Sequence, residues 1–221
     1  MSRPVVVLRP EPGNGATVKR LAAAGLTTIA LPLFKVRPVD WALPDSTCYD
    51  ALLLTSANTI RFGGAQLAAL RALPVLAVGA ATAEAARQAG FRVEAVGEGG
   101  VAALLDTAET KRFQRLLYLG GRDRMVEPGG VVTAAITVYA SEALAVDTDA
   151  LRRIENAVVL LHSARAASRL NVLARINRST VRLAAISAAV AEAAGEGWGQ
   201  HAVATLPTDA ALVALAARLA D

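Results

Sequence analysis

The chain has 221 residues, of which 54% are hydrophobic and 4% aromatic, with one cysteine and a formal net charge of +4. This length allows one large core or two small ones, and the lone Cys48 excludes a disulfide framework or a thiolate metal cluster. A core of mainly Ala, Val and Leu favours helices packed on sheets over a β-sandwich. No apolar run reaches the roughly 18 residues that span a bilayer. Residues 1–10 have no signal-like segment, so we expect a cytoplasmic, soluble protein with no membrane partner.

The charge pattern favours an anionic small molecule over nucleic acid as the ligand. The cations are twenty arginines against three lysines, scattered along the chain with few aromatic residues between them. Nucleic-acid-binding proteins concentrate positive charge on one face and stack bases on aromatic rings. Arginine holds carboxylates through paired hydrogen bonds, so a ligand with several carboxylates fits this pattern better than nucleic acid does. A GC-rich genome that favours arginine codons is the alternative explanation of the arginine excess.

The chain opens with a strand–helix–strand pattern. The run PVVVLRP (4–10) is rich in β-branched residues, as in a strand buried on both faces of a parallel sheet. A turn and a helix follow over 11–25, and Gly25 closes the helix. LTTIALPLF (26–34) is the next predicted strand.

A second series of strand–helix units begins at YDALLLTSA (49–57). Apolar runs typical of buried strands alternate there with stretches of helical periodicity. The predicted strands are 50–55, 74–79, 92–97 and 115–121, the predicted helices are 57–71, 80–90 and 99–108, and a long alternating strand follows over 131–143.

The series then restarts. NAVVLLHSA (156–164) repeats YDALLLTSA 107 positions later. VRLAAIS and the helix after it parallel 74–91, and 200–220 parallels 91–108. Three strand–helix units in the same order predict two copies of one α/β domain.

The order of the elements predicts that one domain is inserted into the other. The first domain consists of 1–36 and 142–221, and the inserted domain is 37–141. Each is a flavodoxin-like α/β domain with a parallel sheet. Two extended crossings, near 34–39 and 138–145, form a two-stranded hinge.

These segments, in this order and spacing, resemble the uroporphyrinogen-III synthase family over essentially the whole chain. The resemblance rests on the opening strand ending at Arg9-Pro10 and on LPLFKVRPV, YDALLLTSANTIRF, LAVGAATAEAARQAGF, LLYLGGRDR, ITVY, VVLLHSARAA and VATLPTDAALVAL.

The resemblance implies a monomeric lyase that closes the linear tetrapyrrole hydroxymethylbilane into uroporphyrinogen III, with inversion of ring D and loss of water. It implies a reaction in the cleft between the two domains, with neither a cofactor nor a metal. Tyr139, at the end of ITVY, is the implied proton donor to the departing hydroxyl. Packing of its ring in the hinge is the structural alternative.

Further candidate substrate-binding residues are those where strands end and helices begin. The free backbone N–H groups of helix N-termini bind anions at such positions. Ser56 and Ser163 either cap helices or bind the substrate. GEGG (97–100) resembles an anion-binding loop. The other candidate substrate-binding residues, each with a structural or solvent-exposed alternative, are Arg9, Thr82, Gly121, Arg122, Arg124, Arg165 and Ser187.

The second copy departs from the Gly-x-x-Thr pattern that the family commonly has and that Thr82 completes. Ser187 and Val190 stand there instead, so no essential hydroxyl is expected at Val190. His162 and His201 are interpreted as structural, because the sequence pattern gives neither an acidic partner, and we predict no triad or metal site.

The alternative hypothesis is a non-catalytic, two-domain protein that binds an anionic metabolite. Conversion of hydroxymethylbilane distinguishes the two.

Overall fold

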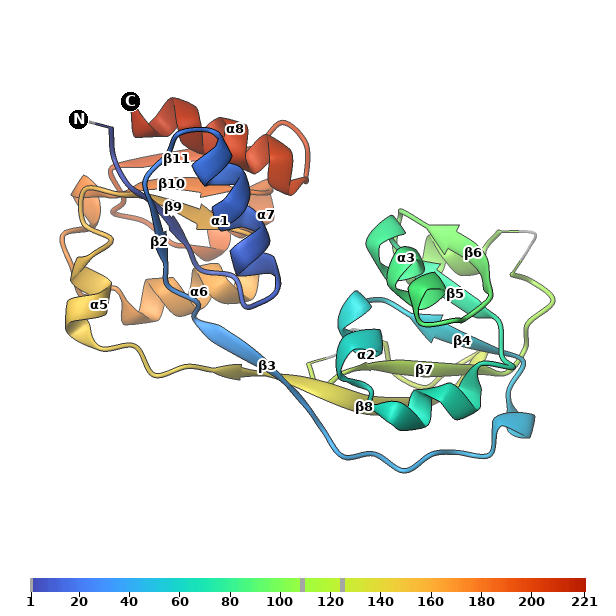
Figure 1. Cartoon of the computed structure of the whole chain (residues 1–221). Helices are drawn as coiled ribbons and strands as arrows, with labels where there is room; N and C mark the ends of the chain where they lie inside the picture. Colours follow the sequence, from blue (N-terminus) through green and yellow to red (C-terminus); the bar gives the residue numbers. More distant parts are fainter. Residues whose placement is uncertain (1, 108–109, 124–125) are drawn as a thin grey trace. The chain divides into compact units, whose positions relative to one another are not determined.

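A computed structural model describes residues 2–107, 110–123 and 126–221 (Figure 1). The chain divides into two compact units. Unit 1 consists of Met1–Lys35 and Glu142–Asp221, and unit 2 is Val36–Ser141. The chain passes between the units in β3 (Phe34–Pro38) and in β8 (Val132–Ala143), which are neighbours in one sheet. Unit 2 is therefore inserted into unit 1 through a two-stranded connection.

Unit 1 is built on a five-stranded parallel sheet with the order β11-β10-β9-β1-β2. The central strands β1 and β9 are buried along their whole length. Their continuous apolar sequences follow from this burial on both faces. The strands are β1 (Val5–Val7), β2 (Thr28–Ala30), β9 (Val158–Leu161), β10 (Arg182–Ala185) and β11 (Gln200–Val203).

Helices cover both faces of this sheet (Figure 1). Leu21 of α1 and Leu212 of α8 share an apolar cluster with Val7 on one face. Leu170 of α6 packs in a second cluster with Val6 on the other face. The helices are α1 (Gly13–Ala23), α5 (Thr148–Arg152), α6 (Ala164–Leu173), α7 (Ala188–Ala193) and α8 (Asp209–Ala220), with the 3₁₀ turn η3 (Arg178–Thr180).

Unit 2 has a six-stranded sheet with the order β3-β8-β7-β4-β5-β6. Its last five strands are parallel. The edge strand β3 is antiparallel to β8. Val39 N–H donates to the Val138 carbonyl and Leu144 N–H donates to the Leu33 carbonyl, so residue numbers rise along one strand as they fall along the other. The remaining elements are β4 (Ala51–Leu54), β5 (Val75–Val78), β6 (Val93–Gly97), β7 (Leu116–Gly121), α2 (Ala57–Phe62), α3 (Ala80–Gln88), α4 (Val101–Leu105), η1 (Ser46–Cys48) and η2 (Ala65–Leu70).

The two sheets repeat one design. The strands β4, β5 and β6 begin at 51, 75 and 93, and β9, β10 and β11 begin at 158, 182 and 200, so each pair is separated by 107 positions. The order β6-β5-β4-β7-β8 in unit 2 corresponds to β11-β10-β9-β1-β2 in unit 1. The predicted fold class, two similar parallel-sheet α/β domains with one inserted in the other, is confirmed.

The helix predicted over 57–71 is interrupted. α2 ends at Phe62, and a 3₁₀ turn follows only after Gly64, whose φ of 78° is left-handed. The indole N–H of Trp41 donates a hydrogen bond of 2.9 Å to the Gly63 carbonyl. This carbonyl is therefore bonded to a side chain instead of to a backbone N–H of a continuing helix. A glycine with positive φ ends helices at no steric cost, so the prediction of one long helix was wrong.

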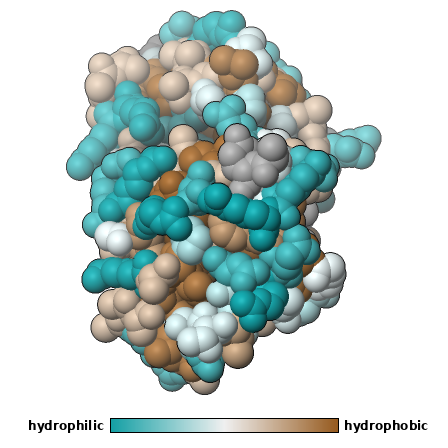
Figure 2. Space-filling model, turned by 90° about the vertical axis from the view of Figure 1, so that its right-hand side faces the viewer, coloured by the Kyte–Doolittle hydropathy of each residue, from teal (hydrophilic) through white to brown (hydrophobic). Residues whose placement is uncertain are grey.

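Hydrophilic side chains cross the face shown in Figure 2 and separate its apolar areas. Among the described residues, no helix combines the length and the apolar character that a membrane span requires.

Candidate active site

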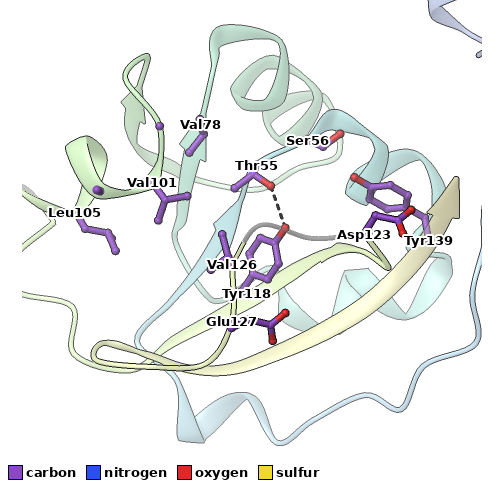
Figure 3. Close-up of a pocket in the computed structure, with 13 residues that line it drawn as sticks. Thr55, Ser56, Val78, Val101, Leu105, Tyr118, Asp123, Val126, Glu127 and Tyr139 are labelled. Atoms are coloured by element: carbon purple, nitrogen blue, oxygen red, sulfur yellow. Dashed lines mark hydrogen bonds between the residues drawn. The ribbon is translucent and has the colours of Figure 1, made fainter. Parts of the chain in front are cut away.

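Unit 2 has a cavity of about 760 Å³ beside the carboxyl ends of its parallel strands (Figure 3). Ligands of open α/β sheets bind at this edge, where strands give way to loops and helix N-termini. The lining residues are Thr55, Ser56, Val78, Gly100, Val101, Ala102, Leu105, Tyr118, Gly121, Asp123, Val126, Glu127 and Tyr139.

Tyr139 and Gly121 meet at the cavity wall. The two residues pair across β8 and β7. Gly121 is buried and has no side chain, and a Cβ there would lie 2.7 Å from Cε2 of Tyr139. The half-buried tyrosine ring therefore lies against the glycine backbone, with the ring of Phe62 at 6.5 Å between centroids. Glycine at 121 is needed for this close approach.

A second tyrosine lies in the same cavity. The hydroxyl of Tyr118, whose side chain is almost fully buried, is 3.1 Å from the hydroxyl of Thr55 (Figure 3). Its ring lies over Gly120, where a Cβ would be 2.6 Å from Cε1 of the tyrosine. Sequence reasoning missed this pair. The available signal was the alternation Tyr-x-Gly, which puts both residues on one face of the strand.

The predicted hydroxyl residues of unit 2 differ in their roles. Ser56 lines the cavity and also caps α2, because its Oγ accepts a hydrogen bond from Asn58 N–H at 3.2 Å. Thr82 lies in the first turn of α3 and is 5% exposed. It is not among the cavity-lining residues. Gly100 is the N-cap of α4 with a φ of 93°, and it is the member of the GEGG stretch that lines the cavity.

Arg122 follows Gly121 and is exposed, and its backbone N–H donates to the Tyr139 carbonyl at 2.9 Å. Arg124 lies outside the described residues.

In unit 1, Arg9 follows β1 and is tied to a polar cluster. Its Nη1 donates to Oδ1 of Asp209 at 3.3 Å and to the hydroxyl of Thr17 at 3.4 Å. The Arg9 side chain is 33% exposed. It is therefore held by the fold and still reaches solvent.

His162 has an acidic partner, which corrects the sequence prediction. Its Nε2 lies 2.7 Å from Oδ1 of Asp209, 47 positions away in the chain. Burial lowers the pKa of His162, although the hydrogen bond that His162 donates to Asp209 opposes this shift. Burial acts to raise the pKa of Asp209, but hydrogen bonds from Thr17 and His162 outweigh it and the pKa is lowered. A neutral imidazole thus donates to an ionised carboxylate. His201 is exposed on β11.

The remaining predicted residues also lie in unit 1. Ser163 caps α6 by accepting a hydrogen bond from Ala166 N–H at 3.3 Å. The exposed Arg165 lies over the ring of Phe34, with its Cζ 4.5 Å from the centroid, a cation–π contact. Ser187 occupies the N-cap of α7 without a side-chain capping hydrogen bond, and Val190 is buried in the apolar core.

The structure thus brings Ser56, Gly121 and Tyr139 together at one cavity. Arg9, Ser163, Arg165 and Ser187 belong to unit 1. Among the described residues, no three His, Cys, Asp or Glu side chains are grouped so as to hold a metal ion.

Residues 15–214 match the family model described as uroporphyrinogen-III synthase HemD. The chain is 29% identical over 153 residues to a uroporphyrinogen-III synthase from Chlorobaculum parvum. This match covers 61% of the chain and 62% of the relative, which is less than two thirds of the length of that protein.

The fold is similar to two solved structures. The uroporphyrinogen-III synthetase of Helicobacter pylori has a TM-score of 0.65 and 16% identity, covering 98% of this chain and 99% of that one. A mutant uroporphyrinogen III synthase of Thermus thermophilus has a TM-score of 0.50 and 17% identity, covering 96% and 97%. At these identities the likeness establishes the fold.

Proposed function

Because the chain belongs to the uroporphyrinogen-III synthase family, we propose that it closes hydroxymethylbilane into uroporphyrinogen III. Ring D is inverted in this reaction, and one molecule of water is released. The observation that carries the proposal is the placement of Tyr139, whose ring lies against Gly121 at the wall of the cavity.

The substrate supplies much of its own activation. A pyrrole nitrogen donates electrons that expel the terminal hydroxyl, and the substituted carbon of ring D then attacks to form a spiro intermediate. Rearrangement of this intermediate inverts ring D, and loss of a proton from carbon restores the aromatic pyrrole. One C–O bond is exchanged for one C–C bond and water leaves, without net oxidation or reduction. The reaction therefore needs no redox cofactor.

Tyr139 is the proposed general acid. A phenol keeps its proton at neutral pH and can donate it to the departing hydroxyl, which then leaves as water. The proton released from carbon at ring closure balances this donation. A positioned general acid contributes about 10²–10⁴-fold to a rate. We expect a contribution near 10²-fold, because the pyrrole nitrogen already drives the departure.

Binding of the substrate's carboxylates is proposed to involve both units, with the substrate in a cleft between them. The proposed cations are the exposed or half-exposed Arg9, Arg122 and Arg165. Ser56, Thr82, Ser163 and Ser187 lie at or near helix N-termini, where backbone N–H groups attract carboxylates. We propose that the enzyme acts as a monomer that closes around one substrate molecule.

The deciding experiment is incubation of the protein with hydroxymethylbilane, followed by oxidation and chromatography of the uroporphyrin isomers. Isomer III above the spontaneous background is the expected product. Binding without faster consumption of the bilane would instead identify a non-catalytic protein. Isomer I alone would contradict the proposed inversion.

Closure of the two units is tested separately by X-ray scattering with and without uroporphyrin III, the oxidised product. A smaller radius of gyration with ligand is expected. An unchanged radius at saturating ligand would contradict binding between the units, but not the reaction itself.

A further inference from the structure

The two units carry different chemistry at corresponding positions. Thr55 follows β4 and lines the cavity of unit 2. The residue 107 positions later is His162, which follows β9. Val101 is the first residue of α4 and points into the cavity, whereas Asp209 is the first residue of α8.

Arg9 also has a counterpart in unit 2. Leu116 pairs with Ala51 on β4, and Val5 pairs with Val158, the equivalent residue on β9. Four residues beyond Leu116 and Val5 stand Gly120 and Arg9, respectively. A threonine, a valine and a glycine in unit 2 are therefore replaced in unit 1 by His162, Asp209 and Arg9, and Asp209 hydrogen-bonds with both of the others.

Asp209 is the centre of this cluster. Its Oδ1 accepts hydrogen bonds from Thr17 Oγ1 at 2.6 Å, from His162 Nε2 at 2.7 Å and from Arg9 Nη1 at 3.3 Å. Its Oδ2 accepts from Arg20. The Asp209 and His162 side chains are 16% and 8% exposed. Such buried networks fix side-chain positions when their members are paired.

The backbone and the guanidinium of Arg9 are also held. The amide of Asn14, which is 1% exposed, donates to the carbonyls of Arg9 and Val7 at 2.9 Å each. The Nε–Nη2 side of the guanidinium faces Gly13, where a Cβ would lie nearest to Nε, 2.6 Å from Cζ and 2.7 Å from Nη2. Because glycine has no side chain, this side of the guanidinium is left uncovered there.

The anchoring occupies one end of the guanidinium. Both hydrogen bonds of Arg9 use Nη1, and within the described part of the chain no acceptor lies on Nε or Nη2. The Nε–Nη2 edge has the spacing of a carboxylate and binds it through two parallel hydrogen bonds.

We propose that Asp209 is a positioning residue that, together with His162, holds Arg9 so that its Nε–Nη2 edge binds one carboxylate of the substrate. The inference rests on the proposed function for the identity of the ligand. Asp209 itself does not touch the substrate. It keeps a long and otherwise mobile side chain in one orientation, so that less conformational entropy is lost on binding.

Two variants test the position of the Arg9 side chain by changing two different neighbours of it. Asp209→Asn retains the size of the side chain and removes its charge, which releases Nη1. Gly13→Ala adds a methyl group that displaces the flexible end of Arg9 and leaves Asp209 intact. Each is expected to raise the KM for hydroxymethylbilane on the order of 10-fold. The kcat should stay within about twofold, because a contact made equally before and during the reaction affects KM.

Asp50→Asn is the matched control. Asp50 pairs with Arg115 at 2.8 Å just before β4, at the amino end of the sheet. The variant removes a carboxylate from an ion pair away from the cavity edge, so its KM should equal that of the wild type. Gly13→Ala should fold as the wild type does, because the atoms that its methyl group meets belong to the flexible end of the Arg9 side chain.

Arg9→Ala combined with Asp209→Asn supplies the decisive comparison. If Asp209 acts through Arg9, the double variant has the KM of Arg9→Ala alone. Multiplicative effects, or an unchanged KM in both Asp209→Asn and Gly13→Ala, overturn the inference while leaving the proposed function intact. If Asp209→Asn does not fold, Gly13→Ala still tests whether the anchored position of Arg9 matters for binding, and an unchanged KM in that variant overturns the inference. A wild-type protein that makes no isomer III refutes the proposed function, which is a separate result.

Discussion

The close contact between Gly121 and Tyr139 leads to a quantitative prediction for Gly121→Ala. The new Cβ would stand 2.7 Å from Cε2 of Tyr139, whereas ordinary contact begins at 3.4 Å, so the ring must move by about 0.7 Å. The backbone of Gly121 has a negative φ, so alanine causes no backbone strain there. A misplacement of about 1 Å costs roughly 100-fold in rate. We therefore expect kcat to fall by about 10- to 100-fold.

The assay is the initial rate of isomer III formation, together with the free energy of unfolding from urea melts. Overpacking costs about 1–3 kcal/mol, which leaves the protein folded at the assay temperature. Gly129→Ala is the control, because a Cβ there meets no atom within 4 Å and the backbone is not left-handed. A wild-type kcat in Gly121→Ala would refute the idea that the glycine sets the position of a proton donor.

Three further predictions concern single side chains. Tyr139→Phe keeps the ring and is expected to lower kcat by about 10²-fold with isomer III still the main product; an unchanged rate removes Tyr139 from the mechanism. Ser56→Ala and Ser163→Ala each remove a helix cap and should lower the free energy of unfolding by about 1 kcal/mol in urea; unchanged midpoints would show that capping is not their role. Because burial lowers the folded-state pKa of His162 below that of the unfolded chain, the unfolded chain binds a proton first as the pH falls below about 6.5. Stability is therefore lost between pH 7 and pH 5, and His162→Gln should reduce this loss; equal slopes in the two proteins would contradict the assignment.

The fold follows from the sequence because its signals are local and repeated. Strands buried on both faces, such as Ala51–Leu54 and Val158–Leu161, require continuous apolar runs. The same three strand–helix units occur twice in the same order, which identifies the duplication without any knowledge of tertiary contacts. The break after Phe62 has a local signal in the Gly63-Gly64 pair. The contact that accompanies it has none, because the indole that binds the Gly63 carbonyl comes from Trp41, 22 positions earlier.

The candidate site was predicted less completely, for a physical reason. Ser56 starts a helix and Gly121 ends a strand, where position in the element indicates exposure at the carboxyl edge. Tyr139 lies within β8, and its role was predicted from the family resemblance. The pair of Thr55 and Tyr118 joins residues 63 positions apart.

The partner of His162 was missed for the same reason. Asp209 lies in the first turn of another helix, where an acidic residue is already explained by the helix dipole. No periodicity links such residues, so tertiary structure is needed to find them.

The divergence of the two copies agrees with the proposed reaction, which is asymmetric although the two domains share one design. In unit 2 the carboxyl edge of the sheet is hollow and carries the hydroxyls of Thr55, Tyr118 and Tyr139, which suits an uncharged pyrrole ring and a leaving hydroxyl. In unit 1 the corresponding edge carries Asp209 and its hydrogen-bond partners, and this network holds the cation of Arg9 in place. Under the proposed function, a substrate carboxylate bound by Arg9 would orient the tetrapyrrole for the reaction at Tyr139.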